Sequence, residues 1–317
     1  MSAHAVSLDD IRAAAERTRT LVRRTPVWRS GSASRRAGRE IVFKCENLQK
    51  GGAFKIRGAS NFLFSMTAED RARGVVAFSS GNHAQATAIA ARRFGAPATI
   101  VMPDDAPKSK VAATEANGAK IVVYDRLTGN REEIGRRIAS ETGATLVPPF
   151  DHPWIIAGQG TCALEFLEQE PGLDALVVCL GGGGLLGGCA VAAKALKPGI
   201  RVYGVEPEIA NDWWLSLRQG APVSIPPPAT IADGLRTQKP GQYTFPIVRD
   251  LVEEVILVTE DEIKETVKFL MSRMKLVVEP SGAVAAAAVL HGKIPAAALT
   301  GVVLSGGNVD FETLAAL

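Results

Sequence analysis

Short apolar runs alternate with segments of helical periodicity along nearly the whole chain. Mostly apolar runs of strand length occur at residues 41–44, 75–78, 98–102, 120–124, 175–180, 202–206, 255–258 and 299–304. Segments with the spacing of helices lie between them, at 81–94, 108–117, 129–142, 157–168, 185–196, 260–274 and 281–290. Because strands that alternate with helices form mostly parallel sheets covered on both faces, the pattern predicts an α/β fold.

The same pattern predicts two lobes. The chain has 317 residues, which corresponds to about two domains at ~150 residues per domain. Four strand–helix units fall within residues 74–147, so we predict a small domain at 67–149. The strands before and after this segment would then form a large domain from residues 1–66 and 150–317.

Composition and charge narrow the functional classes. Hydrophobic residues make up 46% and charged residues 22% of the chain, which is typical of a globular protein. The formal net charge is only +3 and no basic stripe with interleaved aromatic residues occurs, so we expect no nucleic-acid partner. An uncharged stretch at 175–193 is rich in glycine, which disfavours a helix in a membrane. The absence of an export signal and of a CxxC pair favours a cytoplasmic protein with reduced cysteines.

Four consecutive glycines follow a buried strand and precede a helix. They are Gly181, Gly182, Gly183 and Gly184. Consecutive glycines allow backbone N–H groups to converge on an anion at a helix N-terminus, so the run predicts a phosphate site, with a tightly packed turn as the plainer interpretation. Gly182, Gly184 and Gly187 also satisfy GxGxxG, and Glu206 ends the next strand, so an NAD-binding oxidoreductase stays open.

A lysine and two polar loops suggest a site at one sheet edge. Lys55 is flanked by glycines and apolar residues, and such surroundings would lower the pKa of its amine and make it a usable nucleophile and base. The loops are Ser79-Ser80-Gly81-Asn82-His83 and Ser305-Gly306-Gly307-Asn308, each directly after a predicted strand. Taken singly, these features would be a solvent-facing lysine, a helix cap and a C-terminal turn. The carboxyl ends of strands in open α/β sheets bind ligands, so together they predict one site.

These motifs together resemble the pyridoxal-phosphate (PLP) enzymes of the threonine dehydratase and serine racemase family, which have fold type II. The resemblance runs from about Arg24 to the C-terminus, with the motifs in family order. Further matching segments are Ala157-Gly158-Gln159-Gly160-Thr161, Val205-Glu206-Pro207, Ala232-Asp233-Gly234 and Glu279-Pro280-Ser281-Gly282. The resemblance implies two open, mostly parallel-sheet lobes with PLP in the cleft between them.

The resemblance also implies roles for individual residues. Lys55 would form the Schiff base with PLP and exchange the α-proton, and Ser80 could act on the opposite face of the α-carbon. PLP would further contact Phe54, Asn82, Gly181, Gly182, Gly183, Gly184, Leu185, Gly234, Glu279 and Ser305, with Ser305 facing the ring nitrogen. The substrate carboxylate would contact Ser79, Ser80, Asn82 and His83. Glu206, the carbonyl of Ala210 and Asp212 would hold Mg²⁺ or Ca²⁺, for which an exposed acidic helix start is the alternative.

The function implied is that of a dehydratase, or ammonia-lyase. It would convert L-threonine, L-serine or both to a 2-oxo acid and ammonia by β-elimination, with a small-molecule amino acid as its substrate. Two relatives of this activity stay open: serine racemase, because of Ser80, and 3-hydroxyaspartate dehydratase, because Arg236 could reach the substrate side chain. We expect a homodimer or homotetramer that has no membrane partner.

Overall fold

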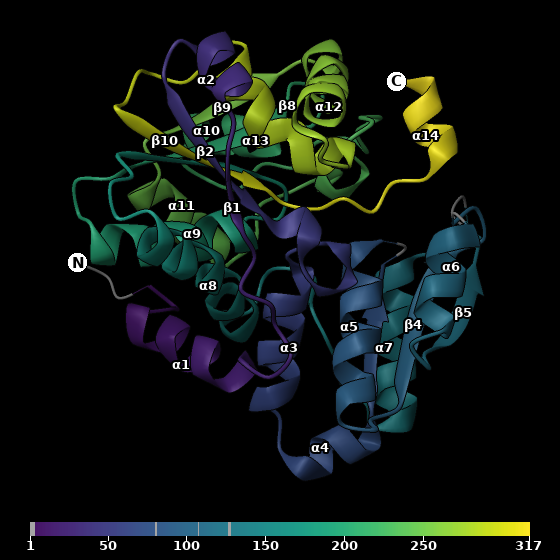
Figure 1. Ribbon diagram of the computed structural model, residues 1–317. Coiled ribbons are helices and arrows are strands. Elements are labelled where there is room, and N and C mark those ends of the chain that lie inside the picture. The colour runs from purple at the N-terminus through teal and green to yellow at the C-terminus, as the bar shows by residue number, and fades with distance from the viewer. Residues whose placement is uncertain (1–3, 80, 107, 126–127) are drawn as a thin grey trace.

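Two β-sheets, one in each lobe, carry the fold of the computed structural model, which describes residues 4–79, 81–106, 108–125 and 128–317 (Figure 1). The larger sheet has the strand order β1-β2-β10-β7-β8-β9 and the smaller one β5-β4-β3-β6. Strand β1 runs antiparallel to β2, and the other described strand pairs are parallel. The prediction of two mostly parallel α/β lobes is therefore confirmed.

The predicted strands are present, and two short ones were missed. The larger sheet contains β1 (Val27–Arg29), β2 (Glu40–Cys45), β7 (Ala175–Cys179), β8 (Arg201–Pro207), β9 (Glu254–Val258) and β10 (Leu299–Leu304). The smaller sheet contains β3 (Val75–Phe78), β4 (Ala98–Pro103), β5 (Lys120–Tyr124) and β6 (Thr145–Leu146). Strands β1 and β6 have three and two residues, too few to show an apolar pattern.

Helices surround both sheets. The first seven are α1 (Leu8–Thr18), α2 (Gly31–Ala37), α3 (Lys55–Ser65), α4 (Ala68–Arg73), α5 (Asn82–Arg93), α6 (Lys108–Glu115) and α7 (Arg131–Thr142). The others are α8 (Pro153–Gln169), α9 (Gly184–Leu196), α10 (Asp212–Gln219), α11 (Thr244–Leu251), α12 (Glu260–Met274), α13 (Pro280–Leu290) and α14 (Phe311–Ala316). None of the described helices combines the length and apolar character that crossing a lipid bilayer requires.

Helix α3 links the two lobes. Its residues Ile56, Ala59, Phe62 and Leu63 belong to the apolar cluster of the smaller sheet, whereas the larger sheet has a separate cluster of its own. In Figure 1 this helix runs between the lobes, with α5 on one side and α8 on the other. The domain boundaries at residues 66 and 149 stay a prediction; α3 ends just before the first of them, yet its apolar side chains pack in the core of the smaller lobe.

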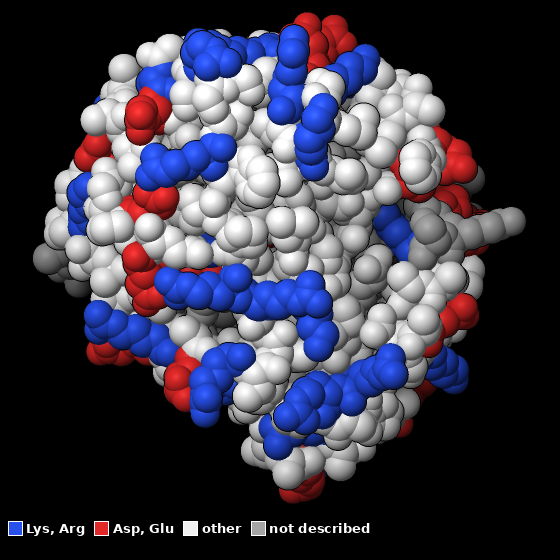
Figure 2. All heavy atoms as spheres, in the orientation of Figure 1, with Lys and Arg blue, Asp and Glu red and all other residues white. Residues whose placement is uncertain are grey.

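The charged residues of the molecule are mixed on the face shown in Figure 2. Lys and Arg form short rows over both lobes, and Asp and Glu lie beside many of them. The exposed ion pairs of the molecule include Arg24 with Glu168 at 2.7 Å and Arg73 with Glu69 at 2.7 Å. Such exposed pairs contribute little to stability individually.

Candidate active site

Lys55 is the first residue of α3, and its amine is held at the edge of the larger sheet. Its Nζ donates a hydrogen bond of 2.8 Å to the carbonyl oxygen of Pro149 and lies 5.2 Å from the ring centroid of Phe54. The N–H of Phe54 in turn donates to the carbonyl of Ser305, at 3.0 Å. Burial lowers the pKa of Lys55 to about 8. The side chain is thus not the solvent-facing lysine that its motif alone allowed, and an appreciable fraction is neutral near pH 8.

A buried ion-pair network fixes the first turn of α3. Arg57, two residues after Lys55, donates to both oxygens of Glu46 at 2.7 and 2.9 Å, and to both oxygens of Glu165 at 3.0 and 2.8 Å. Lys44 adds a second cation, 2.9 Å from Glu165. The sequence analysis gave Arg57 no role, because nothing in a motif shows that an arginine will be enclosed by acids from two other elements.

The four glycines form the turn between β7 and α9. The carbonyl of Gly181 accepts the indole N–H of Trp213, and that of Gly182 accepts the hydroxyl of Thr244 at 3.0 Å. The N–H groups of Gly181, Gly182 and Gly183 have no acceptor within the described part of the chain. A loop with its carbonyls engaged and its N–H groups available, at the start of a helix, is suited to an anion such as phosphate.

Close packing also requires glycine in this loop. A Cβ at Gly182 would overlap the ring of Phe150, and Gly183 has a φ of +86°, which side chains rarely adopt. The phosphate site and the tightly packed turn, which the sequence presented as alternatives, are therefore compatible properties of one loop. Leu185 follows in the first turn of α9 and is buried.

Polar side chains from both lobes meet beside Ser305. Asn82 donates a hydrogen bond of 2.6 Å to Glu279, and Asn308 donates one of 2.8 Å to Asn82. Burial, with the nearby carboxylate of Asp233, raises the pKa of Glu279 to about 8. Ser305 itself is buried at the end of β10. The structure thus places three of the predicted cofactor residues, Asn82, Glu279 and Ser305, at the same edge of the larger sheet.

The segment around Gly234 connects the lobes. The N–H of Gly234 donates to Ser281 at 2.9 Å, and the preceding Asp233 forms an ion pair of 2.8 Å with Lys110 of α6. Lys110 belongs to the smaller lobe and Asp233 to the larger one. This contact holds the two lobes together close to Glu279.

The loop after β3 contains the residues predicted to bind a carboxylate. The hydroxyl of Ser79 accepts the N–H of Gly81 at 3.2 Å, and Ser80 lies outside the described residues. The Nε2 of His83 lies 3.0 Å from the carbonyl of Val147, to which it donates as a neutral imidazole. Burial and the nearby Lys55 lower the pKa of His83 to about 3. His83 therefore provides no positive charge to this loop near neutral pH.

The residues predicted to hold a cation are all buried. Glu206 is the second-last residue of β8, Asp212 begins α10, and Ala210 lies between them. Each is at most 1% exposed, which excludes the exposed acidic helix start. Both oxygens of Asp212 lack a well-aligned hydrogen-bond partner in the described structure, and burial raises its pKa to about 7. Burial also raises the pKa of Glu206 well above its usual range. The described residues contain no cluster of three or more His, Cys, Asp or Glu that could hold a metal ion, so the cation stays a prediction.

Two arginines, Arg236 and Arg131, differ in how far their guanidinium groups are engaged by the rest of the described chain. Arg236 donates two hydrogen bonds, of 2.9 and 2.6 Å, to the carbonyl of Thr230, so its guanidinium is engaged within its own loop. Arg131, at the start of α7, lies with its guanidinium carbon 6.0 Å from the ring centroid of Phe78, the residue before Ser79. No carboxylate of the described residues forms an ion pair with Arg131. Sequence reasoning missed Arg131, because β3 and the start of α7 are far apart in the chain.

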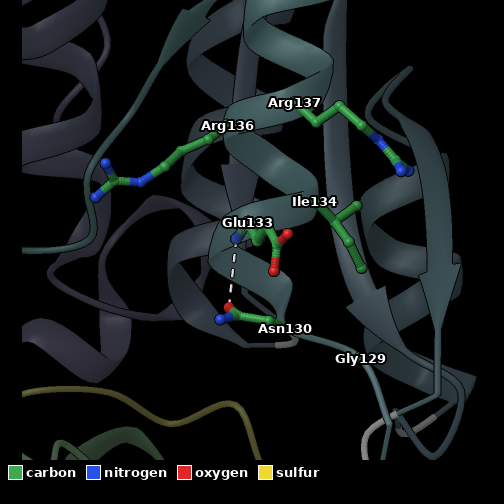
Figure 3. A pocket seen from close by; sticks show the side chains of 6 residues that line it. All are labelled: Gly129, Asn130, Glu133, Ile134, Arg136 and Arg137. Atoms are coloured by element: carbon green, nitrogen blue, oxygen red, sulfur yellow. Dashed lines mark hydrogen bonds between the residues drawn. The ribbon is translucent and has the colours of Figure 1, made fainter.

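A hollow of about 600 Å³ beside α7 does not have the properties of the catalytic site. It is lined by Gly129, Asn130, Glu133, Ile134, Arg136 and Arg137 (Figure 3). In Figure 3 the two arginines point away from each other, and Asn130 accepts the N–H of Glu133 as a helix cap, at 3.3 Å. Its lining therefore offers no convergent set of groups.

The sequence and the fold both have close relatives. The family of pyridoxal-phosphate dependent enzymes matches residues 18–306. An L-threo-3-hydroxyaspartate ammonia-lyase of a Pseudomonas species is 50% identical over 98% of this chain and 98% of its own. A serine racemase of Schizosaccharomyces pombe is 48% identical over 97% of this chain and 95% of its own. The structure of maize serine racemase matches with a TM-score of 0.95 at 44% identity, over 99% of this chain and 97% of the maize chain.

Proposed function

Because the chain belongs to the family of pyridoxal-phosphate dependent enzymes, we propose that this PLP-dependent carbon–oxygen lyase is an ammonia-lyase of 3-hydroxy amino acids. The observation that carries the proposal is the position of Lys55, an amine with a pKa of about 8 at the sheet edge that also presents the glycine loop. Membership of this family removes the NAD-binding oxidoreductase, which rested on the GxGxxG pattern and on the position of Glu206.

The residues at this edge fit PLP. The unpaired N–H groups of the glycine loop suit its phosphate, the amine of Lys55 suits its aldehyde, and the hydroxyl of Ser305 suits its ring nitrogen. When bound, PLP withdraws electrons from the substrate α-carbon and so acidifies the proton there.

The chain's own groups would then carry out the elimination. Lys55 would take the proton from the substrate Cα, and the hydroxyl on Cβ would leave together with that proton as water. The released enamine takes up one water and yields a 2-oxo acid and ammonia, so atoms balance without an oxidant. Ser305 offers a hydroxyl, which does not protonate a ring nitrogen, and this favours prompt loss of the β-hydroxyl. The α-carboxylate is proposed to be bound by the N–H groups at the start of α5 and by the side chains of Ser79, Ser80, Asn82 and His83.

The preferred substrate is proposed to be L-threo-3-hydroxyaspartate, with L-serine and L-threonine as slower substrates. Its second carboxylate needs a cation, and Arg131 supplies one at the carboxyl end of β3 without a competing acid among the described residues. The Pseudomonas relative carries the name of this activity. A guanidinium binds a carboxylate through two parallel hydrogen bonds. The hydroxyl and methyl groups of L-serine and L-threonine cannot form this pair of hydrogen bonds.

A panel of 3-hydroxy amino acids tests this proposal. We expect kcat/KM for L-threo-3-hydroxyaspartate to exceed that for L-serine and L-threonine by about 10-fold or more, since a charge-assisted pair contributes ~1.5–3 kcal/mol. Arg131→Gln should remove most of this preference and leave L-serine turnover nearly unchanged. Arg137→Gln is the matched control, because Arg137 lies on the same helix and pairs only loosely with Glu141, at 3.9 Å. Faster turnover of L-serine or L-threonine by the unaltered enzyme would contradict the proposal.

Racemisation is the second candidate activity. The Schizosaccharomyces pombe relative is named a serine racemase, and this chain has a serine, with its hydroxyl, at position 80. If Ser80 acts as the second acid–base group, Ser80→Ala should lower formation of D-serine from L-serine and spare 2-oxo acid formation. An equal loss of both products would show that Ser80 only maintains the conformation of its loop.

A divalent cation and an oligomer complete the proposal. Mg²⁺ or Ca²⁺ would be bound by Glu206, Asp212 and the carbonyl of Ala210, because hard cations take oxygen ligands and the Asp212 oxygens are buried without good partners. We also propose a homodimer or homotetramer, which light scattering would distinguish from a monomer.

A further inference from the structure

Trp213 lies between the glycine loop and the buried acid pair, which consists of Glu206 and Asp212. It is the second residue of α10, directly after Asp212, and its side chain is fully buried. Its ring stacks on Phe245 of α11 with centroids 6.0 Å apart and an angle of 30° between the planes. The sequence analysis gave it no role, because a tryptophan within a short helix normally contributes only to the core.

The indole is in direct contact with the glycine loop. Its N–H donates to the carbonyl of Gly181, and a Cβ at Gly183 would meet its Cζ2 at 2.5 Å. A bulkier residue at Gly183 would thus displace the ring. The hydroxyl of Thr244 holds the next carbonyl, that of Gly182, at 3.0 Å. Trp213 and Thr244 therefore bind the carbonyl side of the loop, which leaves its N–H groups to face a phosphate.

The backbone of the same residue is in contact with the acid pair. The N–H groups of Trp213 and Trp214 donate to the two oxygens of Glu206, at 3.4 and 2.8 Å. Asp212, immediately before them, has two buried oxygens without well-aligned partners. Charging both carboxyl groups of this buried pair without a counter-ion is unfavourable, and a divalent cation would remove that cost at the first turn of α10.

We propose that Trp213 is a positioning residue that couples a divalent cation between Glu206 and Asp212 to the phosphate-binding conformation of the glycine loop. This inference rests on the cation and cofactor sites proposed above, and extends them with a connection between the two. A cation fixes the first turn of α10, the indole N–H then stays on Gly181, and the loop keeps its N–H groups aligned for phosphate. Coupling between two binding sites is reciprocal, so the phosphate must also strengthen binding of the cation.

The test measures PLP binding to the apoenzyme without any substrate. Titrations monitored by absorbance would be done in EDTA and in excess MgCl₂ or CaCl₂. We expect the cation to lower the dissociation constant of PLP about 10-fold in the unaltered protein, within the usual range of coupling between sites. Trp213→Phe keeps a ring and loses the indole N–H. In this variant the dissociation constant of PLP should be nearly the same in EDTA as in MgCl₂ or CaCl₂. The two salts should still raise the melting temperature of the apoenzyme.

Trp214→Phe is the matched control. Trp214 is adjacent in the chain, and its ring packs against Arg218 instead of the loop, with the guanidinium carbon 3.8 Å from its centroid. It should keep the coupling of the unaltered protein. The ³¹P resonance of bound PLP in the unaltered protein should also shift when the cation is added, a measurement that needs no variant.

Three results would overturn the coupling: a dissociation constant of PLP that is the same with and without either cation, a ³¹P resonance that does not shift when the cation is added, or full coupling in Trp213→Phe. None of these results would bear on the ammonia-lyase activity, which is measured separately by 2-oxo acid formation.

Discussion

Arg57 and Glu46 form a doubly hydrogen-bonded ion pair in which neither side chain is exposed to solvent. Their two hydrogen bonds, of 2.7 and 2.9 Å, connect α3 to the segment that follows β2. Because Arg57 lies two residues after Lys55, this pair determines where the reactive amine is held. The position of the Lys55 amine thus depends on a salt bridge that is fully buried in the protein interior.

Loss of this pair should destabilise the whole protein. Arg57→Met leaves Glu46 buried without a cation, and breaking a buried pair in this way costs about 3–5 kcal/mol of unfolding free energy. Arg24→Met is the control, because Arg24 and Glu168 are both about half exposed and such pairs contribute about 0–1 kcal/mol. Urea unfolding followed by circular dichroism measures both variants, and similar losses in the two would show that the buried pair has no special role.

The glycine loop should not tolerate even one added methyl group. In Gly182→Ala the Cβ overlaps the ring of Phe150, so the loop or the ring must move. We expect a loss of about 1–3 kcal/mol in stability and a weaker affinity for PLP. Gly199→Ala is the control, since a Cβ there has no atom within 4 Å and φ is not positive. Unchanged PLP affinity in Gly182→Ala would mean that the loop does not bind the phosphate.

Acid stability should depend on His83. Its pKa is lowered to about 3 in the folded protein, below the usual 6.5, so the unfolded chain binds this proton more readily. The stability that His83 provides is complete above about pH 6.5 and is lost as the pH falls towards 3, at up to about 1.4 kcal/mol per pH unit. In His83→Gln the unfolding free energy should fall less between pH 6.5 and 5 than in the unaltered protein. If the unfolding free energies of the two proteins fell equally over this pH range, His83 would be charged in the folded state.

Removal of a divalent cation should lower stability. A ligand that binds only the folded state at 100 times its Kd adds about 2.7 kcal/mol, so EDTA should reduce the melting temperature and MgCl₂ or CaCl₂ should restore it. Asp212→Asn should no longer respond, because it loses one of the two carboxylates. A response retained in that variant would assign the cation to another site.

The sequence predicted the strands and the positions of the main loops, because buried parallel strands and glycine runs are local patterns. Helix α3 was not predicted, since its polar residues Arg57, Ser60 and Asn61 are buried and hide its periodicity. The roles of Arg131, Trp213 and Arg57 depend on contacts between segments distant in the chain, which no local pattern contains. The neutral state of His83 likewise follows from its burial against Val147 and Lys55.

The account depends most on Lys55 as the residue that binds PLP covalently. Treating the PLP-loaded protein with borohydride makes such a bond permanent, and peptide mass spectrometry then locates it. We predict a pyridoxyl group on Lys55 alone, and a rate of PLP addition to the apoenzyme that rises with pH around 8, as the amine loses its proton. A label on a different lysine, or a protein that stays unlabelled and colourless in excess PLP, would contradict the account.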